Sequence, residues 1–168
     1  MKKIVVVCAL LLIGVSASKA QEAVNPTSDI ASKFNEQFKD ATNVQWSKMN
    51  NISVARFNFG KSFRIAYYDQ AGELIARGRK IPEAQLPMNV FEDLQVIKSD
   101  LENKSGKVAM GGVYEFLRQS GETEYVTSLE TDQYSVTLAT IGGKLGLQKK
   151  ARKHTISEPQ DMIAKAPH

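Results

Sequence analysis

The chain has one cysteine among its 168 residues, and this residue, Cys8, lies inside an apolar run near the N-terminus. If that run is removed by processing, the rest of the chain can form no disulfide and offers no thiolate for chemistry. Its stability must then come from a hydrophobic core. The remaining chain is long enough for one, because a domain of about 150 residues buries roughly 68–70% of its unfolded surface.

Histidine is nearly as scarce. The two histidines, His154 and His168, lie at the C-terminal end, where no pattern holds them together as a catalytic or metal-binding pair. The sequence contains no nucleophile elbow, H-E-x-x-H motif, phosphate-binding glycine loop or EF-hand loop. Acidic residues such as Glu124 and Asp132 cluster near predicted turns, where solvated carboxylates are ordinary. We therefore predict a protein that is not an enzyme and uses no metal or cofactor.

Long apolar runs are also absent after the first twenty residues. Lys2 and Lys3 precede an apolar run over 4–13, and the small residues of Ser18-Lys19-Ala20 follow it. This pattern predicts a signal peptide over 1–20, cleaved before Gln21, and hence a periplasmic or secreted protein. The run is too short for a transmembrane helix, so we expect no stable membrane insertion after cleavage.

Cleavage also removes most of the excess positive charge. The whole chain has 22 basic and 18 acidic side chains, a net charge of +4, and the three lysines of the signal account for most of it. The mature chain would keep 19 basic against 18 acidic residues, a net charge of +1. We therefore do not expect nucleic acid as a partner.

The first half of the mature chain has the periodicity of one helix and four strands. Ile30, Phe34 and Phe38 recur every four residues, as on one face of a helix, and Thr27 or Ser28 can cap it. From Asn43 onward the period changes to two, which predicts antiparallel strands over 43–48, 52–58, 62–68 and 73–80.

The second half repeats this order. After a linker over 81–88, an N-cap at Asn89, an apolar stripe and Gly106 predict a second helix, and residues 107–153 alternate again. The fold class is therefore α+β, with two tandem units of one helix plus a four-stranded antiparallel meander, over 21–81 and 82–153. Residues 154–168 are predicted to be a flexible tail. The lysines of 144–153 are expected to protect an edge strand from pairing, or to form a patch for a membrane surface or anionic glycan.

Turn lengths predict which side chains share a face. A two-residue turn at 50–51, a three-residue loop around Gly60 and a four-residue loop over 69–72 set one register for the first four strands. The residues expected to face the helix are Val44, Trp46, Ala55, Phe57, Phe63, Ile65, Tyr67 and Leu74.

The same register predicts a candidate binding face on the side of the sheet that faces away from the helix. It places Arg56, Arg64 and Arg77 directly opposite one another, with Arg79 one row away and Tyr68 beyond. Like charges directly opposite in a sheet are unfavourable and need compensation. Solvent or carboxylates of the second half, such as Glu115 or Glu124, are one explanation. An acidic partner or ligand held by the guanidinium groups is the other.

A set of residues over 34–90 has a recognisable spacing: Phe38, Ala41, Val44, Trp46, Ala55, Phe57, Gly60, Tyr67, Tyr68, Asp69, Gly72, Leu86 and Pro87. In this spacing the chain resembles the bacterial periplasmic PepSY-like proteins of the β-lactamase-inhibitor-like fold. The resemblance implies a helix-plus-four-strand unit, often in tandem, and non-catalytic binding outside the cytoplasm, with inhibition of a peptidase or other protein as one form. No functional residue of the family can be transferred to this chain.

The prediction is therefore an exported, non-catalytic binding protein whose partner is an extracytoplasmic protein or peptide, with an inhibitory role as one form. The alternative is a periplasmic carrier of a small apolar or anionic ligand. A stoichiometric protein partner in a native pull-down would favour the first hypothesis, and a co-purified small molecule would favour the second.

Overall fold

The computed structural model describes residues 24–153. The predicted signal peptide, its cleavage site before Gln21, the predicted tail and both histidines lie outside the described residues. Within this range, no helix is both long and apolar enough to cross a membrane.

Residues 24–153 form two α-helices, one short 3-10 helix and nine strands. In chain order the elements are α1 (Ser28–Gln37), β1 (Ala41–Met49), β2 (Ile52–Phe59), β3 (Ser62–Tyr68), β4 (Leu74–Ile81), η1 (Glu83–Gln85), α2 (Met88–Ser105), β5 (Ala109–Met110), β6 (Val113–Arg118), β7 (Thr123–Glu130), β8 (Tyr134–Ile141) and β9 (Lys144–Arg152). The α+β class predicted from the sequence is confirmed.

The helix ends follow local signals only in part. Thr27 caps α1, since its hydroxyl accepts a hydrogen bond from the backbone N–H of Ile30 at 3.5 Å. Gly106 ends α2 with a φ of 77°, as predicted. The predicted N-cap at Asn89 is wrong, because α2 begins at Met88 after Pro87. The Asn89 side chain instead donates to the Gly143 carbonyl at 2.8 Å, which ties α2 to the β8–β9 turn.

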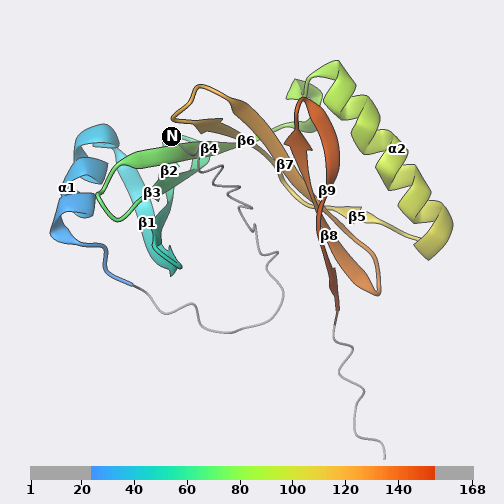
Figure 1. Ribbon diagram of the computed structural model, residues 1–168, viewed down its shortest axis with the longest axis horizontal. Helices are drawn as coiled ribbons and strands as arrows, with labels where there is room; N and C mark the ends of the chain where they lie inside the picture. Colours follow the sequence, from blue (N-terminus) through green and yellow to red (C-terminus); the bar gives the residue numbers. More distant parts are fainter. Residues whose placement is uncertain (1–23, 154–168) are drawn as a thin grey trace, which may run out of the picture.

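The strands of both halves form one antiparallel sheet (Figure 1). Its order is β1-β2-β3-β4-β6-β7-β8-β9, with β5 pairing beside β7. The junction is the pairing of β4 with β6 over six residue pairs, from Ala76–Arg118 to Ile81–Val113. Two separate four-stranded meanders are therefore not observed: the second half contributes five strands, and its sheet continues that of the first.

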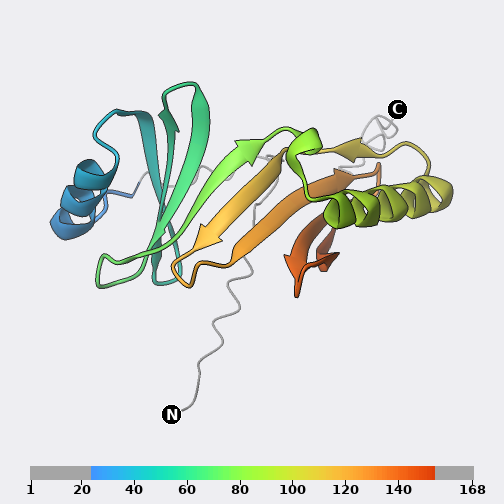
Figure 2. The ribbon, with the colours of Figure 1, turned by 90° about the horizontal axis from the view of Figure 1, so that it is seen from above.

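Both helices lie on the same face of this sheet, at opposite ends. The side chains of α1 pack on β1–β3 through Phe34, Phe57 and Tyr68, and those of α2 pack on β7–β9 through Leu94 and Leu138. Figure 1 shows the sheet as an arch with the helices on its outer side, and Figure 2 shows the middle strands between them. We call the helix-bearing side the outer face and the opposite side the inner face.

The inner face has an apolar cluster of its own. Its members come from β2, β3, β4, β6, β7 and β8, and they are Val54, Ile65, Tyr67, Ala76, Phe116, Val126 and Ala139. The ring of Phe116 lies directly over Gly78, where an added Cβ would be 2.3 Å from the ring. Gly78 is therefore required for close packing at the junction between the halves.

The predicted register is correct for the first turn and wrong for the next two. Trp46 pairs with Ala55, as expected from the Asn50–Asn51 turn. The second turn has two residues, not three, so Phe57 pairs with Arg64 instead of Phe63. In β3–β4, Ile65 pairs with Gly78 and a bulge follows Tyr67.

The error has a physical cause. β3 is buried on both faces over four consecutive residues, from Ile65 to Tyr68. Alternation of apolar residues therefore did not show which side of β3 faces α1. A one-residue slip then moved every side chain of β3 to the wrong face.

Candidate functional site

The structure separates the five residues predicted as a candidate binding face. Arg56 lies on the inner face opposite Ile65, where its Nη1 donates to the Ser47 hydroxyl at 2.7 Å. Arg64, Arg77 and Arg79 lie together on the outer face, the side that bears the helices. The predicted row of Arg56, Arg64 and Arg77 is therefore wrong, because the shorter Gly60 turn puts Arg56 and Arg64 on opposite faces.

The observed arrangement is a row of five side chains across five strands. Phe57 of β2 pairs with Arg64 of β3, Arg64 with Arg79 of β4, Arg79 with Glu115 of β6, and Glu115 with Tyr125 of β7. Phe57 belongs to the apolar cluster under α1, and Tyr125 packs at the border of the cluster under α2. The three charged residues therefore occupy the part of the outer face between the two helices.

A cleft of about 440 Å³ opens at this place. Ring and aliphatic side chains line one part of it and charged side chains the other. The lining residues are Gln37, Phe38, Phe57, Phe59, Arg64, Ile65, Arg77, Gly78, Arg79, Glu115 and Leu117. We call it the arginine cleft. Its volume lies within the range of about 300–1,000 Å³ that is common for small-molecule sites.

Glu115 neutralises one of the three guanidinium groups. Its Oε2 accepts a hydrogen bond from Arg79 Nε, and its Oε1 accepts one from the Tyr125 hydroxyl at 3.5 Å. The hydrogen bond and charge of Glu115 raise the pKa of Arg79. Burial raises the pKa of Tyr125, and the nearby Glu115 carboxylate raises it further. Glu115 was one of the two carboxylates named from the sequence as a compensating charge, and it has that role for Arg79.

The other two arginines have no such partner. Within residues 24–153, neither Arg64 nor Arg77 has an ion pair or hydrogen bond to a side chain or backbone group. The Nε of Arg64 is buried and lacks an acceptor within residues 24–153, and Arg64 lies directly across from Arg79 in the β3–β4 ladder. A buried donor without an acceptor costs roughly 1–3 kcal/mol. The cleft thus holds three guanidinium groups against one carboxylate, and two of the three are unpaired among the described residues.

Tyr68 does not line the cleft, but it binds Gln37, which does. Its side chain is fully buried under α1, and burial raises its pKa to about 12. The neutral hydroxyl donates to Gln37 Oε1 at 3.0 Å. Because the carbonyl oxygen of Gln37 is held in this way, its amide nitrogen is left as a hydrogen-bond donor at the edge of the cleft. Tyr68 is therefore a positioning residue.

The residues of the cleft do not form a catalytic arrangement. A guanidinium group stays protonated and cannot act as a general base, and Glu115 is held by Arg79. Among the described residues, no three His, Cys, Asp or Glu side chains are grouped to hold a metal ion. What the cleft can do is bind negative charge beside apolar surface.

Several lining residues were not identified from the sequence. Phe38 was assigned to the core, Phe59 and Leu117 were not assigned a role, and all three border the cleft. The sequence signal that could have pointed to Phe38 was its position at the end of the predicted helix. In the structure its ring centroid lies 4.7 Å from that of Phe57 and 6.1 Å from that of Phe59. The pairing of β4 with β6, which brings Leu117 and Glu115 beside the arginines, had no local signal.

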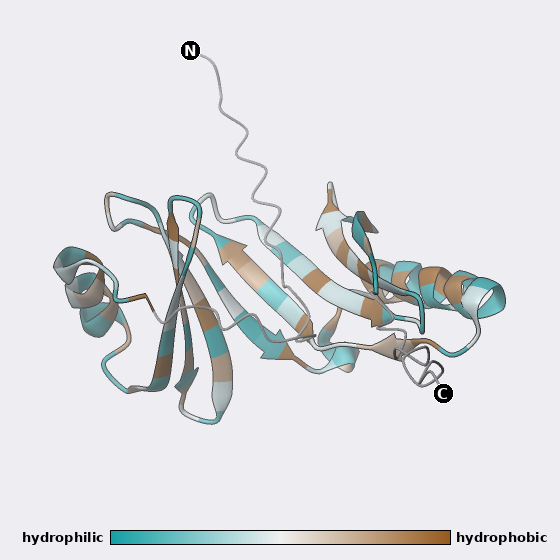
Figure 3. Cartoon of the chain, turned by 90° about the horizontal axis from the view of Figure 1, so that it is seen from below, coloured by the Kyte–Doolittle hydropathy of each residue, from teal (hydrophilic) through white to brown (hydrophobic). Residues whose placement is uncertain are grey.

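A second surface lies on the inner face. Half-buried apolar side chains surround the inner cluster, namely Met49, Ile52, Phe63, Ile75 and Tyr114. The rings of Phe63 and Tyr114 are 6.3 Å apart. No helix among the described residues covers this side of the middle strands, which is the side seen in Figure 3. The inner face therefore presents apolar and aromatic surface over the middle of the sheet.

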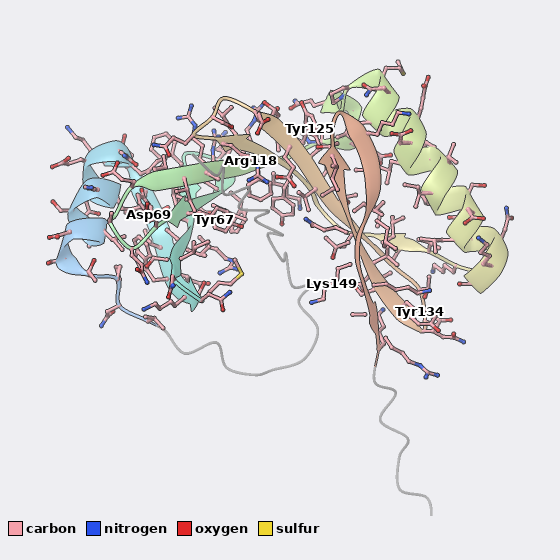
Figure 4. All side chains as sticks on the ribbon, viewed as in Figure 1. Tyr67, Asp69, Arg118, Tyr125, Tyr134 and Lys149 are labelled. Carbon is pink, nitrogen blue, oxygen red and sulfur yellow. The ribbon has the colours of Figure 1, made fainter. Side chains whose placement is uncertain are left out.

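Charged residues border this surface. Arg118 pairs with Glu124 at 2.5 Å, and Glu124 is buried there. Tyr67 and Arg118 flank Ala76 from neighbouring strands, and both are labelled in Figure 4. Glu124, the other carboxylate named from the sequence, thus compensates Arg118 and none of the predicted arginines.

The basic segment 144–153 contains the strand β9, which lies at the edge of the sheet as expected, and protection of this edge from pairing stays a prediction. Lys150 lies 4.0 Å from the ring centroid of Tyr134, and Lys153 pairs with Glu130 at 2.9 Å. A role as a patch for a membrane surface or anionic glycan stays a prediction.

The fold defines a class of protein: one arched antiparallel sheet with two helices on its outer face. Solved structures with a similar fold include proteins from Bacteroides species. A BLIP-like protein from Bacteroides fragilis aligns with a TM-score of 0.52 and 17% identity, over 77% of this chain and 87% of that one. A protein from Bacteroides eggerthii inferred to be periplasmic aligns with a TM-score of 0.60 and 10% identity, over 77% and 90%. A DUF2874 family protein from Bacteroides ovatus aligns with a TM-score of 0.56 and 15% identity, over 84% and 99%.

These likenesses show a BLIP-like fold. At such identities they show the fold alone, so function must be argued from the surfaces of this chain. No protein-family model and no curated protein matches the sequence. The BLIP-like part of the predicted resemblance is thus supported, and membership of the PepSY-like family stays a prediction.

Proposed function

We propose that this chain is an exported, non-catalytic binding protein that holds a protein partner on the inner face of its sheet. The observation that carries the proposal is the aromatic and aliphatic surface around Phe63 and Tyr114, which no described helix covers. Contiguous apolar surface of this kind, bordered by charged residues, is typical of protein interaction sites. Aromatic residues near the centre of such a surface commonly dominate the binding energy.

A location outside the cytoplasm, in the periplasm or secreted, is part of the same proposal. The predicted signal peptide supports it, and so does the likeness to a Bacteroides protein inferred to be periplasmic. Inhibition of the partner is the finer form, which the resemblance to the β-lactamase-inhibitor-like fold favours. Division of the chain into two helix-plus-strand units within one sheet is also proposed, on the order of the elements.

The experiment has two steps: the partner is captured from a bacterial extract, and its binding is then measured with purified proteins. The mature chain, used as bait in extract from the producing bacterium, should retain one protein, which is then identified, purified and shown to bind the bait at equal stoichiometry. The variants Phe63→Ser and Tyr114→Ser should each weaken that binding at least tenfold, because they remove central aromatic anchors.

The matched control is Phe59→Ser, which removes an exposed aromatic side chain from the outer face. It should leave the affinity unchanged. Equal loss in Phe59→Ser and Phe63→Ser would show that the inner face does not hold the partner. All three variants are first compared by thermal unfolding, so that a folding defect is not mistaken for lost binding.

A further inference from the structure

The proposed protein-binding surface lies on the inner face, so it does not use the arginine cleft on the outer face. The cleft is enclosed by the end of α1 and by strands β2, β3, β4 and β6, and it combines two unlike walls. One wall consists of the rings of Phe38, Phe57 and Phe59. The other carries Arg64 and Arg77, whose guanidinium groups have no partner among the described residues. Phe57 is buried behind Phe38, so the accessible apolar surface of the first wall comes from Phe38 and Phe59. This surface and the unpaired guanidinium groups together specify one kind of ligand.

The arginine side chains of the charged wall favour a negatively charged ligand group. Arg64 faces Arg79 directly across the β3–β4 pair, and Arg77 is its diagonal neighbour on the same face. Diagonal neighbours in a sheet are about 7–8 Å apart, which long side chains such as arginine bridge easily. Glu115 is engaged by Arg79, so it leaves the charges of Arg64 and Arg77 uncompensated. A carboxylate between these two groups would relieve the repulsion and supply acceptors for charge-assisted hydrogen bonds.

The orientation of the ligand follows from α1. The helix ends at Gln37, next to the phenyl wall, and a helix C-terminus carries partial negative charge. An anionic group is disfavoured beside Phe38 and favoured at the far side of the cleft, where the arginines lie. The apolar part of the ligand is therefore expected against the partly exposed rings of Phe38 and Phe59.

We propose that the arginine cleft binds a small organic carboxylate, with its carboxylate group held by Arg64 and Arg77 and its apolar body against the rings of Phe38 and Phe59. A small molecule is favoured over a protein segment because the cleft volume of about 440 Å³ matches that of small-molecule sites. This site lies on the opposite face of the sheet from the proposed protein-binding surface and does not depend on it.

The test uses three probes with the full mature chain. Hydrocinnamate carries both a phenyl group and a carboxylate, hydrocinnamyl alcohol lacks the charge, and acetate lacks the phenyl group. Calorimetric titration should show hydrocinnamate binding at least tenfold more tightly than either of the others. Equal affinity for the alcohol and the carboxylate would overturn the proposal, and so would equal affinity for acetate and hydrocinnamate.

Variants then locate the site. Arg77→Gln removes an exposed, unpaired charge and should weaken hydrocinnamate binding about tenfold, the loss expected for one charge-assisted hydrogen bond. Lys80→Gln is the matched control, because it removes the same charge from the same strand on the inner face. Equal weakening in both variants would show that the affinity depends only on the net charge of the protein, and this result would overturn the proposal.

Arg64→Gln separates binding from folding. It removes a charge that faces Arg79, so the melting temperature without ligand should stay the same or rise, while hydrocinnamate binding weakens by at least tenfold. A lower melting temperature with unchanged binding would show that Arg64 has a structural role, against the proposal. Binding of a short acidic peptide together with no binding of hydrocinnamate would likewise assign the cleft to a protein segment and overturn it.

Discussion

Each end of the sheet is covered by one helix, and the side chains that pack between helix and sheet differ between the two ends. Under α1 the contacts are aromatic. The ring centroid of Phe34 lies 5.2 Å from that of Trp46 and 4.9 Å from that of Phe57, and both pairs pack edge to face. Under α2 they are aliphatic, through residues such as Leu94 and Leu138. The helices differ in length as well, with 10 residues in α1 and 18 in α2.

This difference follows from helix length. Each helix buries two side chains, Ile30 and Phe34 in α1 and Val90 and Leu94 in α2, but the short α1 has no further turns to add half-buried contacts. Large rings bury more area per position than aliphatic side chains, so aromatic residues compensate for the missing turns. The longer α2 spreads its contacts over Val90, Leu94 and half-buried neighbours such as Ile97 and Leu101. The comparison teaches that core composition here depends on how many contact positions a helix provides.

The largest expected effect tests whether α1 depends on its few anchors. Phe34→Ala should lower the free energy of unfolding by about 3–5 kcal/mol, because it removes a buried ring that contacts three other aromatic side chains. Urea unfolding followed by fluorescence reports this directly, since Trp46 is the only tryptophan and touches Phe34. The exposed neighbour Asn35→Ala is the control and should change little. A loss below about 1 kcal/mol would mean that α1 is not anchored by this ring.

The next effect concerns the junction that makes both ends part of one sheet. Gly78→Ala should lower the free energy of unfolding by about 1–3 kcal/mol, because the new methyl group would overlap the Phe116 ring. Adding Phe116→Leu should recover part of that loss by making room. If Gly78→Ala is as stable as the parent protein in urea unfolding, the close packing of β4 against β6 is not as described.

A smaller effect measures the aromatic contacts themselves. In a double-mutant cycle with Phe34→Leu and Phe57→Leu, the coupling energy should be about 0.5–1.5 kcal/mol, the usual value for an aromatic pair beyond its buried area. Additive losses, with no coupling, would show that the rings under α1 act only as bulk apolar volume. The two ends of the sheet would then differ in composition but not in the kind of interaction.

The smallest effect is absent near neutral pH and develops only in alkali. The pKa of Tyr68 is raised from 10.0 to about 12 by burial, so its hydroxyl ionises in the unfolded chain before it does in the folded one. Between these values the unfolded state binds fewer protons, and stability falls as pH rises. Tyr68→Phe has no proton to lose and should show a shallower decline over this range, measured by urea unfolding at stepped pH. Parallel curves for the two proteins would contradict the burial of this hydroxyl.

The accuracy of the sequence reasoning varied with the range of the interactions. The helix starting after Thr27, the Asn50 turn and the approximate limits of the first four strands depend on residues close in the chain, and all were predicted. The arginine face was predicted only in part. Arg64, Arg77 and Arg79 do lie together, but on the opposite side of the sheet from the one expected, and Arg56 lies apart from them. A single misjudged turn at Gly60 caused this, since register errors carry along the whole strand.

By itself, the sequence determined the class of the fold, the periodicity of its elements and the scarcity of groups suited to catalysis, because these depend on composition and on contacts within a few residues. Only the tertiary structure decided that β4 pairs with β6, that both helices share one face, and that two arginines without a partner among the described residues line a cleft beside the end of α1. Such features depend on residues far apart in the chain, such as Arg79 and Glu115, whose pairing no local pattern encodes. The physical reason is that strand pairing is specified by the total burial of both faces, which exists only once the whole sheet has formed.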